Sequence, residues 1–246
     1  MGTNAACLGI LLPEDGPSDY EWYDLASVPG CRDAGLPQVA VGQVTSDGHH
    51  EPGALRALGA VERLRPVGEA LLRDHGPAAI VWACTSASFI GGLDWARAQS
   101  GGLSRALGIP ATSTALAFRD ALAALGHDEA DLLSPYPDIV TRRLVRFLRE
   151  GGVETRRIKA LDCPYAEDSH RLDIRAEVRR FAAEYPASHV PLLVPDTAVN
   201  TLALCDELAV AAARPVLTAN QVSLWSGLRL MGADARPTAL GILRDH

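Results

Sequence analysis

The feature that most constrains the fold of this chain is a regular alternation between short apolar runs and longer segments with helical spacing. The run Cys7 to Leu12 ends at a proline, and the run Ala78 to Ala83 is followed by helical sequence as far as Leu107. Strands that alternate with helices favour a parallel sheet with helices on both faces. We therefore predict an α/β fold whose ligands bind beyond the carboxyl ends of the strands.

The same alternation continues to the end of the chain. Glycines close several of the helical segments, as expected for helix ends, and Pro66 is expected to break the long helical segment that contains it. Strands are predicted over residues 7–12, 39–44, 78–83, 131–134, 155–161, 190–194 and 216–218, with a short extended segment after 108–110. Helices are predicted over residues 53–75, between 84 and 107, and over 115–125, 138–150, 172–185, 199–213 and 221–231.

Charge and cysteine content exclude several classes of partner. The 246 residues carry a formal net charge of −7, which disfavours nucleic acid and anionic membrane surfaces. No apolar stretch approaches a bilayer span, and the N-terminal residues lack a basic signal region. The five cysteines show no CxxC pair and no zinc spacing, so we predict a reducing, cytoplasmic setting. The oligomeric state stays open, with a homo-oligomer among the options.

Two segments of the chain resemble each other. Ile80 to Ala87 and Leu192 to Val199 are both an apolar strand, one ionisable residue, a threonine and small residues that open a helix. The ionisable residues are Cys84 and Asp196. Two similar halves facing each other would place these two side chains on opposite walls of one cleft.

Cys84 is the strongest candidate for chemistry. It is predicted to lie where a strand leads into a helix, and free N–H groups there stabilise an anion and lower a thiol pKa. Thr85 and Ser86 would add hydroxyls and N–H groups for a substrate carboxylate or an enolate oxygen. The alternative is a buried structural cysteine.

Asp196 occupies the equivalent position in the second segment. Its functional role would be that of a general acid or base facing the thiol. The alternative is an N-cap for the helix predicted to start near Val199. The two roles are compatible.

Competing signals are weaker. Cys205 lies in an apolar helical run, and Cys163 is the serious rival to Cys84 because it follows a strand. His49 and His50 could bind a metal, but adjacent histidines point apart, which favours an exposed turn. No GxGxxG or Walker-type loop supports nucleotide binding.

Several segments together resemble a known family. Val81 to Phe89 looks like the first cysteine motif of the maleate cis-trans isomerase and arylmalonate decarboxylase group, within the aspartate/glutamate racemase superfamily. Leu8 to Pro13 resembles the first strand of that group, and Ser134-Pro135-Tyr136 resembles a segment whose tyrosine contacts substrate. Arg214 to Trp225 resembles its last strand and helix. The resemblance spans nearly the whole chain.

The resemblance implies two pseudo-symmetric, Rossmann-like α/β domains with parallel sheets and an active site in the cleft between them. The implied domains are residues 1–111 plus 216–246, which carry Cys84, and residues 112–215, which carry Asp196. It also implies chemistry without a metal or organic cofactor. The substrate would be held by Thr85, Ser86, Tyr136, Thr197, Asn220 and the first-loop residue Gly16.

This chain departs from the family pattern at two places. Isomerases and racemases of the group use two cysteines, and the second would fall at Asp196, whereas the decarboxylases keep only the second. The first loop also carries Glu14 and Asp15, which would oppose a dicarboxylate if they pointed inward.

The leading expectation is therefore a cofactor-independent isomerase or racemase of a small carboxylic acid, similar to maleate cis-trans isomerase. Cys84 would be the nucleophile or base, and Asp196 the partner in place of the second cysteine. The alternatives are an arylmalonate-type decarboxylase that uses Cys84 as proton donor, and a ligand-binding homologue that has lost catalysis.

Overall fold

Two four-stranded parallel sheets form the centre of the protein. The structure, a computed structural model, describes residues 6–14, 19–32 and 34–246. The strand order is β2-β1-β3-β4 in the first sheet and β6-β5-β7-β8 in the second, so the two halves have the same topology. The strands are β1 (Cys7–Glu14), β2 (Gln38–Thr45), β3 (Ala79–Trp82), β4 (Ala111–Ser113), β5 (Glu129–Ser134), β6 (Glu154–Ala160), β7 (Leu192–Val194) and β8 (Val216–Thr218).

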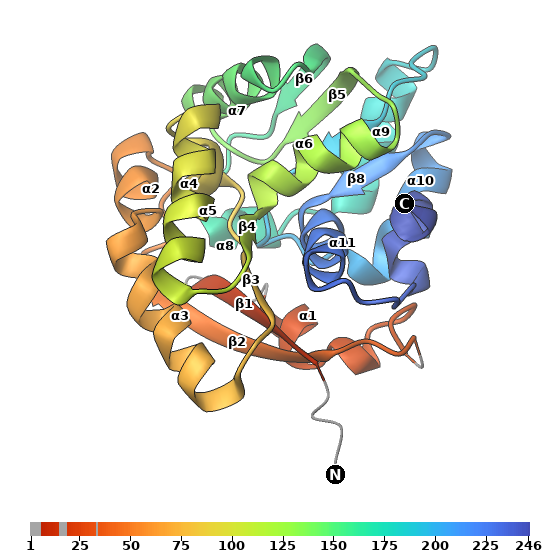
Figure 1. Ribbon diagram of the computed structural model, residues 1–246. Helices are drawn as coiled ribbons and strands as arrows, with labels where there is room; N and C mark the ends of the chain where they lie inside the picture. The colour runs from red at the N-terminus through yellow and green to blue at the C-terminus, as the bar shows by residue number, and fades with distance from the viewer. Residues whose placement is uncertain (1–5, 15–18, 33) are drawn as a thin grey trace.

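Helices surround both sheets, so the predicted α/β fold is confirmed (Figure 1). The long helices are α2 (Pro52–Leu58), α3 (Val61–His75), α5 (Leu93–Leu107), α6 (Thr114–Ala124), α7 (Asp138–Glu150), α9 (Ile174–Glu184), α10 (Cys205–Ala212) and α11 (Ala219–Met231). Shorter ones are α1 (Asp19–Tyr23), α4 (Ser86–Phe89), α8 (Ala166–His170) and the 3₁₀ turns Leu25–Ser27, Leu202–Leu204 and Thr238–Asp245. No helix in the described ranges is both long and apolar enough to cross a bilayer.

Burial along the elements follows their sequence pattern. Every residue of β3 is buried, as expected for the apolar central strand of a covered sheet. The edge strand β6 instead alternates between exposed and partly buried residues, which matches its charged sequence. Helix α7 buries Val140, Leu144 and Phe147 on one face, the spacing of an amphipathic helix.

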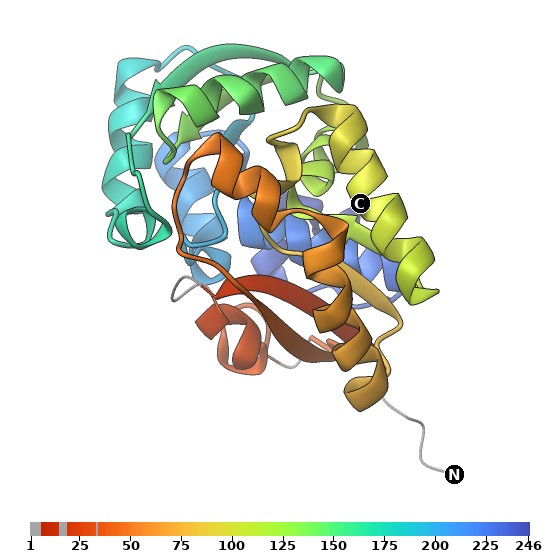
Figure 2. The same cartoon turned by 90° about the vertical axis from the view of Figure 1, so that its left-hand side faces the viewer.

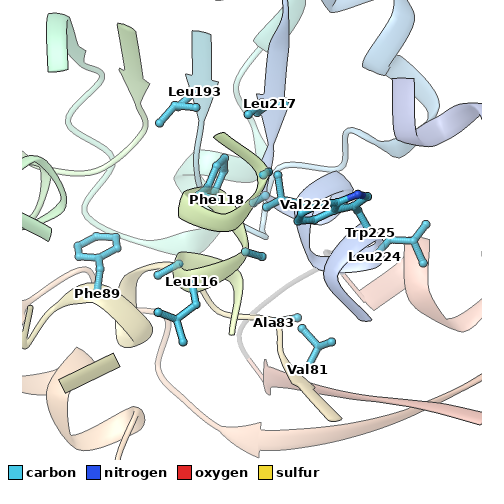
Figure 3. Close-up of a cluster of buried hydrophobic side chains, with 14 of the residues drawn as sticks. Val81, Ala83, Phe89, Leu116, Phe118, Leu193, Leu217, Val222, Leu224 and Trp225 are labelled. Atoms are coloured by element: carbon cyan, nitrogen blue, oxygen red, sulfur yellow. The ribbon is translucent and has the colours of Figure 1, made fainter. Parts of the chain in front are cut away.

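Helices α6 and α11 join the two halves. Figure 1 shows them between the sheet of β1, β2 and β3 and the sheet of β5, β6 and β8. Their side chains belong to one buried cluster that also takes in both sheets. In Figure 3, Phe118 of α6 lies near Leu193 and Val222, while Trp225 and Leu224 of α11 extend toward the first half. Because this shared core is apolar, the relative position of the two sheets is fixed by packing.

Two predicted helices differ from the structure. Pro66 does not break α3 but lies within its second turn, and the chain instead breaks at Gly59, which ends α2. The missing N–H of Pro66 costs one hydrogen bond near the start of the helix, which the rest of α3 tolerates. Helix α10 begins at Cys205 rather than near Val199, after irregular backbone and a short 3₁₀ turn.

The implied domain boundary at 215/216 also differs from the strand pairing. β8 pairs with β7, so it belongs to the second sheet rather than to the first domain. Helix α11, which follows it, does pack against β3 and β1 of the first sheet. The chain therefore crosses between the halves after β8 rather than before it.

Candidate active site

Cys84 and Asp196 line one cavity between the two halves. Cys84 follows β3, Asp196 follows β7, and these strands hold equivalent places in the two sheets. Parallel strands present their carboxyl ends at one edge of the sheet, which is where ligands bind in such folds. The cavity has a volume of about 20 Å³. Its lining residues are Pro13, Ser46, Gly48, His50, Leu55, Leu58, Cys84, Ser86, Ala166, Asp196, Thr197 and Ala198.

The Cys84 side chain is buried beside the start of α4. Its Sγ lies 3.8 Å from the Ser86 hydroxyl, and the Ser88 hydroxyl donates to its backbone carbonyl. The helix expected after Cys84 is divided into α4, of four residues, and α5, which begins at Leu93. The dipole of a long helix therefore does not act on the thiol, and its polar surroundings are local hydroxyl and N–H groups.

Asp196 sits on strained backbone. Its φ angle is +86°, a region that residues other than glycine rarely occupy and that clusters at functional sites. Its N–H lies 3.3 Å from the Thr85 hydroxyl. The second half therefore directly contacts residues 83–85, the Cys84 loop between β3 and α4. Its Oδ1 accepts from Ala198 N–H at 3.1 Å. The predicted N-cap role is not found, because no helix begins there.

His50 is a site residue that the sequence interpretation missed. An exposed turn was expected, but the imidazole is buried and lines the cavity. Its Nε2 lies 3.7 Å from Asp196 Oδ2, and its Nδ1 lies 2.8 Å from the carbonyl oxygen of Cys163. His49 turns away and stacks on Tyr165, as expected for neighbouring residues of an extended segment. No group of three or more metal-ligating side chains occurs within the described ranges.

The segment that carries His50 joins the two halves. An antiparallel bridge pairs His49 with Tyr165, flanked by hydrogen bonds from His50 N–H to Pro164 and from Ala166 N–H to Gly48. Figure 2 shows this orange segment between β2 and α2 running along the side of the molecule toward the second half. His50 is therefore buried by contacts with residues more than a hundred positions away.

Tyr136 is fully buried next to the cavity. Burial raises its pKa well above the ordinary value, and the nearby Asp196 and Cys84 charges raise it further, while the Thr85 and Ser86 hydroxyls oppose the change. The phenol oxygen makes no well-formed hydrogen bond within the described structure. Tyr136 therefore stays neutral and has an O–H to donate.

The other predicted substrate-binding residues lie at different distances from the cavity. Thr197 lines it, as Ser86 does. The Asn220 amide nitrogen donates to Glu21 at 2.6 Å and to the Thr197 carbonyl at 3.2 Å, so it contacts the site through Thr197. Gly16 and Asp15 lie outside the described residues. Glu14 is exposed and accepts from Thr45, and it is not among the cavity residues.

The remaining cysteines have the properties of core residues. Burial raises the pKa of Cys31 and Cys163 to about 11 and that of Cys205 to about 12. Burial also raises the pKa of Cys7. A thiol with such a pKa is not a thiolate near neutral pH, so none of these four is suited to nucleophilic chemistry.

Comparison with known proteins defines the class to which this fold and site belong. The sequence model of the arylmalonate decarboxylase family matches residues 59–244, and the chain belongs to that family. No curated protein sequence matches the chain.

Solved structures give the same grouping. Unliganded arylmalonate decarboxylase is 26% identical, with a TM-score of 0.75 over 98% of this chain and 99% of that one. Maleate isomerase from Pseudomonas putida, as a variant with maleate, is 17% identical, with a TM-score of 0.83 over 97% of each chain. A maleate cis-trans isomerase variant from Nocardia farcinica, with a covalently bound succinylcysteine intermediate, is 19% identical, with a TM-score of 0.82 over 97% of this chain and 98% of that one. The resemblance to this group is thus confirmed.

Proposed function

We propose that this protein is a cofactor-independent isomerase or racemase of a small carboxylic acid. The observation that carries the proposal is the position of Cys84 and Asp196, which line one cavity from equivalent strand ends of the two halves. A planar carbon bound between them would have a thiol on one face and a carboxyl group on the other. Racemisation requires a proton acceptor and a proton donor on opposite faces of the carbon, and cis-trans isomerisation requires a nucleophile that can add to the double bond and leave again.

Each side of the cavity has a distinct role in this proposal. In racemisation the Cys84 thiolate takes a proton from the substrate carbon, and the Asp196 side gives a proton to the opposite face. In isomerisation the thiolate adds to the double bond, the resulting single C–C bond rotates, and the C–S bond breaks to release the thiolate. Hydroxyl and N–H groups of Thr85, Ser86, Tyr136 and Thr197 hold the carboxylate and the developing enolate oxygen. The Nocardia farcinica isomerase, with its succinylcysteine intermediate, offers a precedent for thiol addition within this fold.

The charges of the cavity limit the substrate. Among the described residues that line it, none is lysine or arginine, and Asp196 contributes a carboxylate. Leu55, Leu58 and Ala166 add apolar surface. These features favour a monoacid with a small apolar substituent over a dicarboxylate.

A decarboxylase is the second candidate, because the family model that matches the chain is that of arylmalonate decarboxylase. In that reaction the substrate loses carbon dioxide to give an enediolate, and Cys84 donates the proton that completes the product. Carbon dioxide release from substituted malonates distinguishes this reaction from isomerisation, which releases none.

The first prediction tests both candidates. Cys84→Ala should lower turnover by about 10²–10⁴-fold, the usual contribution of a positioned acid–base group. Cys163→Ala is the matched control, because it removes another buried thiol but keeps the backbone carbonyl that contacts His50. Turnover of candidate monoacids would be followed by chiral chromatography and proton exchange, and that of malonates by carbon dioxide release. Full activity of folded Cys84→Ala would contradict the proposal. Ligand-induced stabilisation without turnover would indicate a binding protein.

A further inference from the structure

His50 is held on three sides by groups that it contacts directly. Its Nδ1 lies 2.8 Å from the Cys163 carbonyl oxygen, and its ring meets the Tyr136 ring edge-on at 4.8 Å between centroids. Its Nε2 lies 3.7 Å from Asp196 Oδ2. The orientation of the imidazole is thus set by the backbone after β6 and by the side chain after β5.

The hydrogen bond to Cys163 decides where the first ring proton lies. A carbonyl oxygen can only accept, so Nδ1 must carry a proton. In a neutral imidazole Nε2 would then carry no proton, and its lone pair would face the lone pairs of the Asp196 carboxylate. Two buried acceptors that face each other are unfavourable, whereas one proton between them makes the pair attractive. Asp196 Oδ2 is buried and has no hydrogen-bond partner within the described structure.

We propose that His50 is held as an imidazolium facing the Asp196 carboxylate, and that it is the positioning residue that supplies Asp196 with the proton delivered opposite Cys84. This inference rests on the proposed function. The proton resides on the imidazole because an imidazole is a stronger base than a carboxylate. The ion pair also compensates a buried carboxylate in a cavity whose described lining offers no lysine or arginine.

The titratable groups around His50 come from four elements. Cys84 follows β3, Tyr136 follows β5, Cys163 follows β6 and Asp196 follows β7. Tyr136 is neutral and the Cys163 thiol is protonated at neutral pH, because burial raises the pKa of both. Of these four groups, Asp196 faces the imidazole Nε2 at 3.7 Å, and Cys84 lines the same cavity.

The proton step balances without any further reactant. Nε2 and Oδ2 approach by about 1 Å to reach hydrogen-bond distance, and the Nε2 proton passes to Oδ2. The O–H bond then breaks as the electron pair of the enolate forms the new C–H bond, while Cys84 holds the proton removed from the opposite face. His50 ends neutral and Cys84 ends as a thiol, and after product release water takes the proton from Cys84 and returns one to His50, which restores both.

The experiment reads the protonation state of His50 directly. Two-bond ¹⁵N–¹H correlation spectra of the full chain with ¹⁵N-labelled histidine distinguish an imidazolium from each neutral tautomer. His50 would be identified among the seven histidines by His50→Gln, with His49→Gln as the matched control from the neighbouring position. Should His50→Gln fail to fold, through-bond correlation to the backbone makes the assignment in the unmutated protein.

At pH 7.5 we expect His50 to carry protons on both ring nitrogens, and Asp196→Asn to leave one, on Nδ1. A neutral ring in the unmutated protein, or an imidazolium that persists in Asp196→Asn, would overturn the inference. His50→Gln should also lower kcat by about 10²-fold with little change in KM, whereas His75→Gln, at the exposed end of α3, keeps both. An unchanged kcat would likewise overturn it.

These results stay separate from the test of the proposed function. An inactive Cys84→Ala together with a neutral His50 ring would leave the proposed reaction standing and remove the role of His50. An imidazolium at His50 in a protein whose Cys84→Ala variant keeps full turnover would leave the ion pair standing and remove the proposed reaction.

Discussion

At the scale of single residues, Glu21 is the second buried carboxylate that bears on the site. Its two oxygens accept from Leu202 N–H at 2.8 Å and from the Asn220 amide at 2.6 Å, and Asn220 in turn donates to the Thr197 carbonyl. Glu21 of α1 is thereby linked to the residue next to Asp196. Burial raises the pKa of Glu21 from 4.5 to about 7, against the effect of its hydrogen bonds.

This pKa predicts a pH dependence of stability. The folded state binds the Glu21 proton more tightly than the unfolded state, so the stability it confers is complete below pH 4.5 and is lost as the pH rises to about 7. The free energy of unfolding falls by roughly 3 kcal/mol over this pH range because of Glu21. Glu21→Gln should remove that part of the decrease, as measured by urea unfolding at pH 4.5 and pH 8. The exposed Glu62→Gln is the control, and the same decrease in Glu21→Gln as in the unmutated protein would contradict the prediction.

The residues of the site were not equally visible in the sequence. Cys84 and Asp196 could be found because each ends an apolar strand, and the position of a strand end in a parallel sheet is a local property of the chain. His50 could not be found in this way, because the polar residues that precede it, Ser46 to Gly48, indicate a turn. Its burial depends on a bridge to residues 164–166, which no local pattern encodes.

At the scale of elements, the contact between α2 and α4 positions the Cys84 loop. A Cβ added at Gly59, the end of α2, would lie 2.2 Å from the Ala87 carbonyl oxygen. The Gln99 amide donates to the carbonyls of both residues, at 2.6 Å from Gly59 and 3.0 Å from Ala87, and so fixes this approach. Only glycine allows the two backbones to come this close.

Gly59→Ala should therefore destabilise the protein by about 1–3 kcal/mol, the usual cost of overpacking. It should also lower turnover, because Ala87 lies three residues from Cys84. Gly101→Ala in the middle of α5 is the matched control, since its Cβ would meet only the Arg105 guanidinium, at 3.4 Å. The free energy of unfolding of Gly101→Ala should rise by about 0.5–1 kcal/mol, because alanine has a higher helix propensity than glycine. Urea midpoints of the two variants should move in opposite directions, and a shift in the same direction would contradict this account.

The elements themselves were predictable where periodicity is strong and local. The predicted bounds of α7 and of β8 agree with the structure, because α7 is strongly amphipathic and β8 is a short apolar run between a proline and a capping threonine. Pro66 misled the prediction because helix breaking by proline depends on its distance from the helix start. Helix α8 was missed, because its five residues carry no apolar periodicity.

At the scale of the whole molecule, the sequence indicated two similar halves but not how they meet. Strand order and the crossing of α6 and α11 arise from packing between distant segments. For that reason the implied domain boundary at 215/216 differs from the strand pairing, which places β8 in the second sheet. The cavity between the halves has about 20 Å³, room for about one water molecule, so a substrate can enter only if the lining separates.

We predict that the bridge between His49 and Tyr165 opens to admit substrate, because it joins the two halves beside the cavity. The flanking hydrogen bonds make the two residues a non-hydrogen-bonded antiparallel pair, in which the Cα atoms lie about 4.5 Å apart. That separation suits a disulfide. The double variant His49→Cys, Tyr165→Cys, once oxidised, should hold the halves closed. Iodoacetamide labelling of Cys84 should then slow by at least about tenfold, which corresponds to about 1.4 kcal/mol against opening.

Reduction of the double variant should restore the original labelling rate, and the single variant His49→Cys should show no dependence on oxidation. Labelling at Cys84 would be read by mass spectrometry, which separates it from labelling at the four other buried cysteines. Those four cysteines also serve as internal references. Equal labelling in the oxidised and reduced forms would show that the reagent reaches Cys84 by another route. The opening would then have to be sought at α2, whose residues Leu55 and Leu58 form the apolar wall of the cavity.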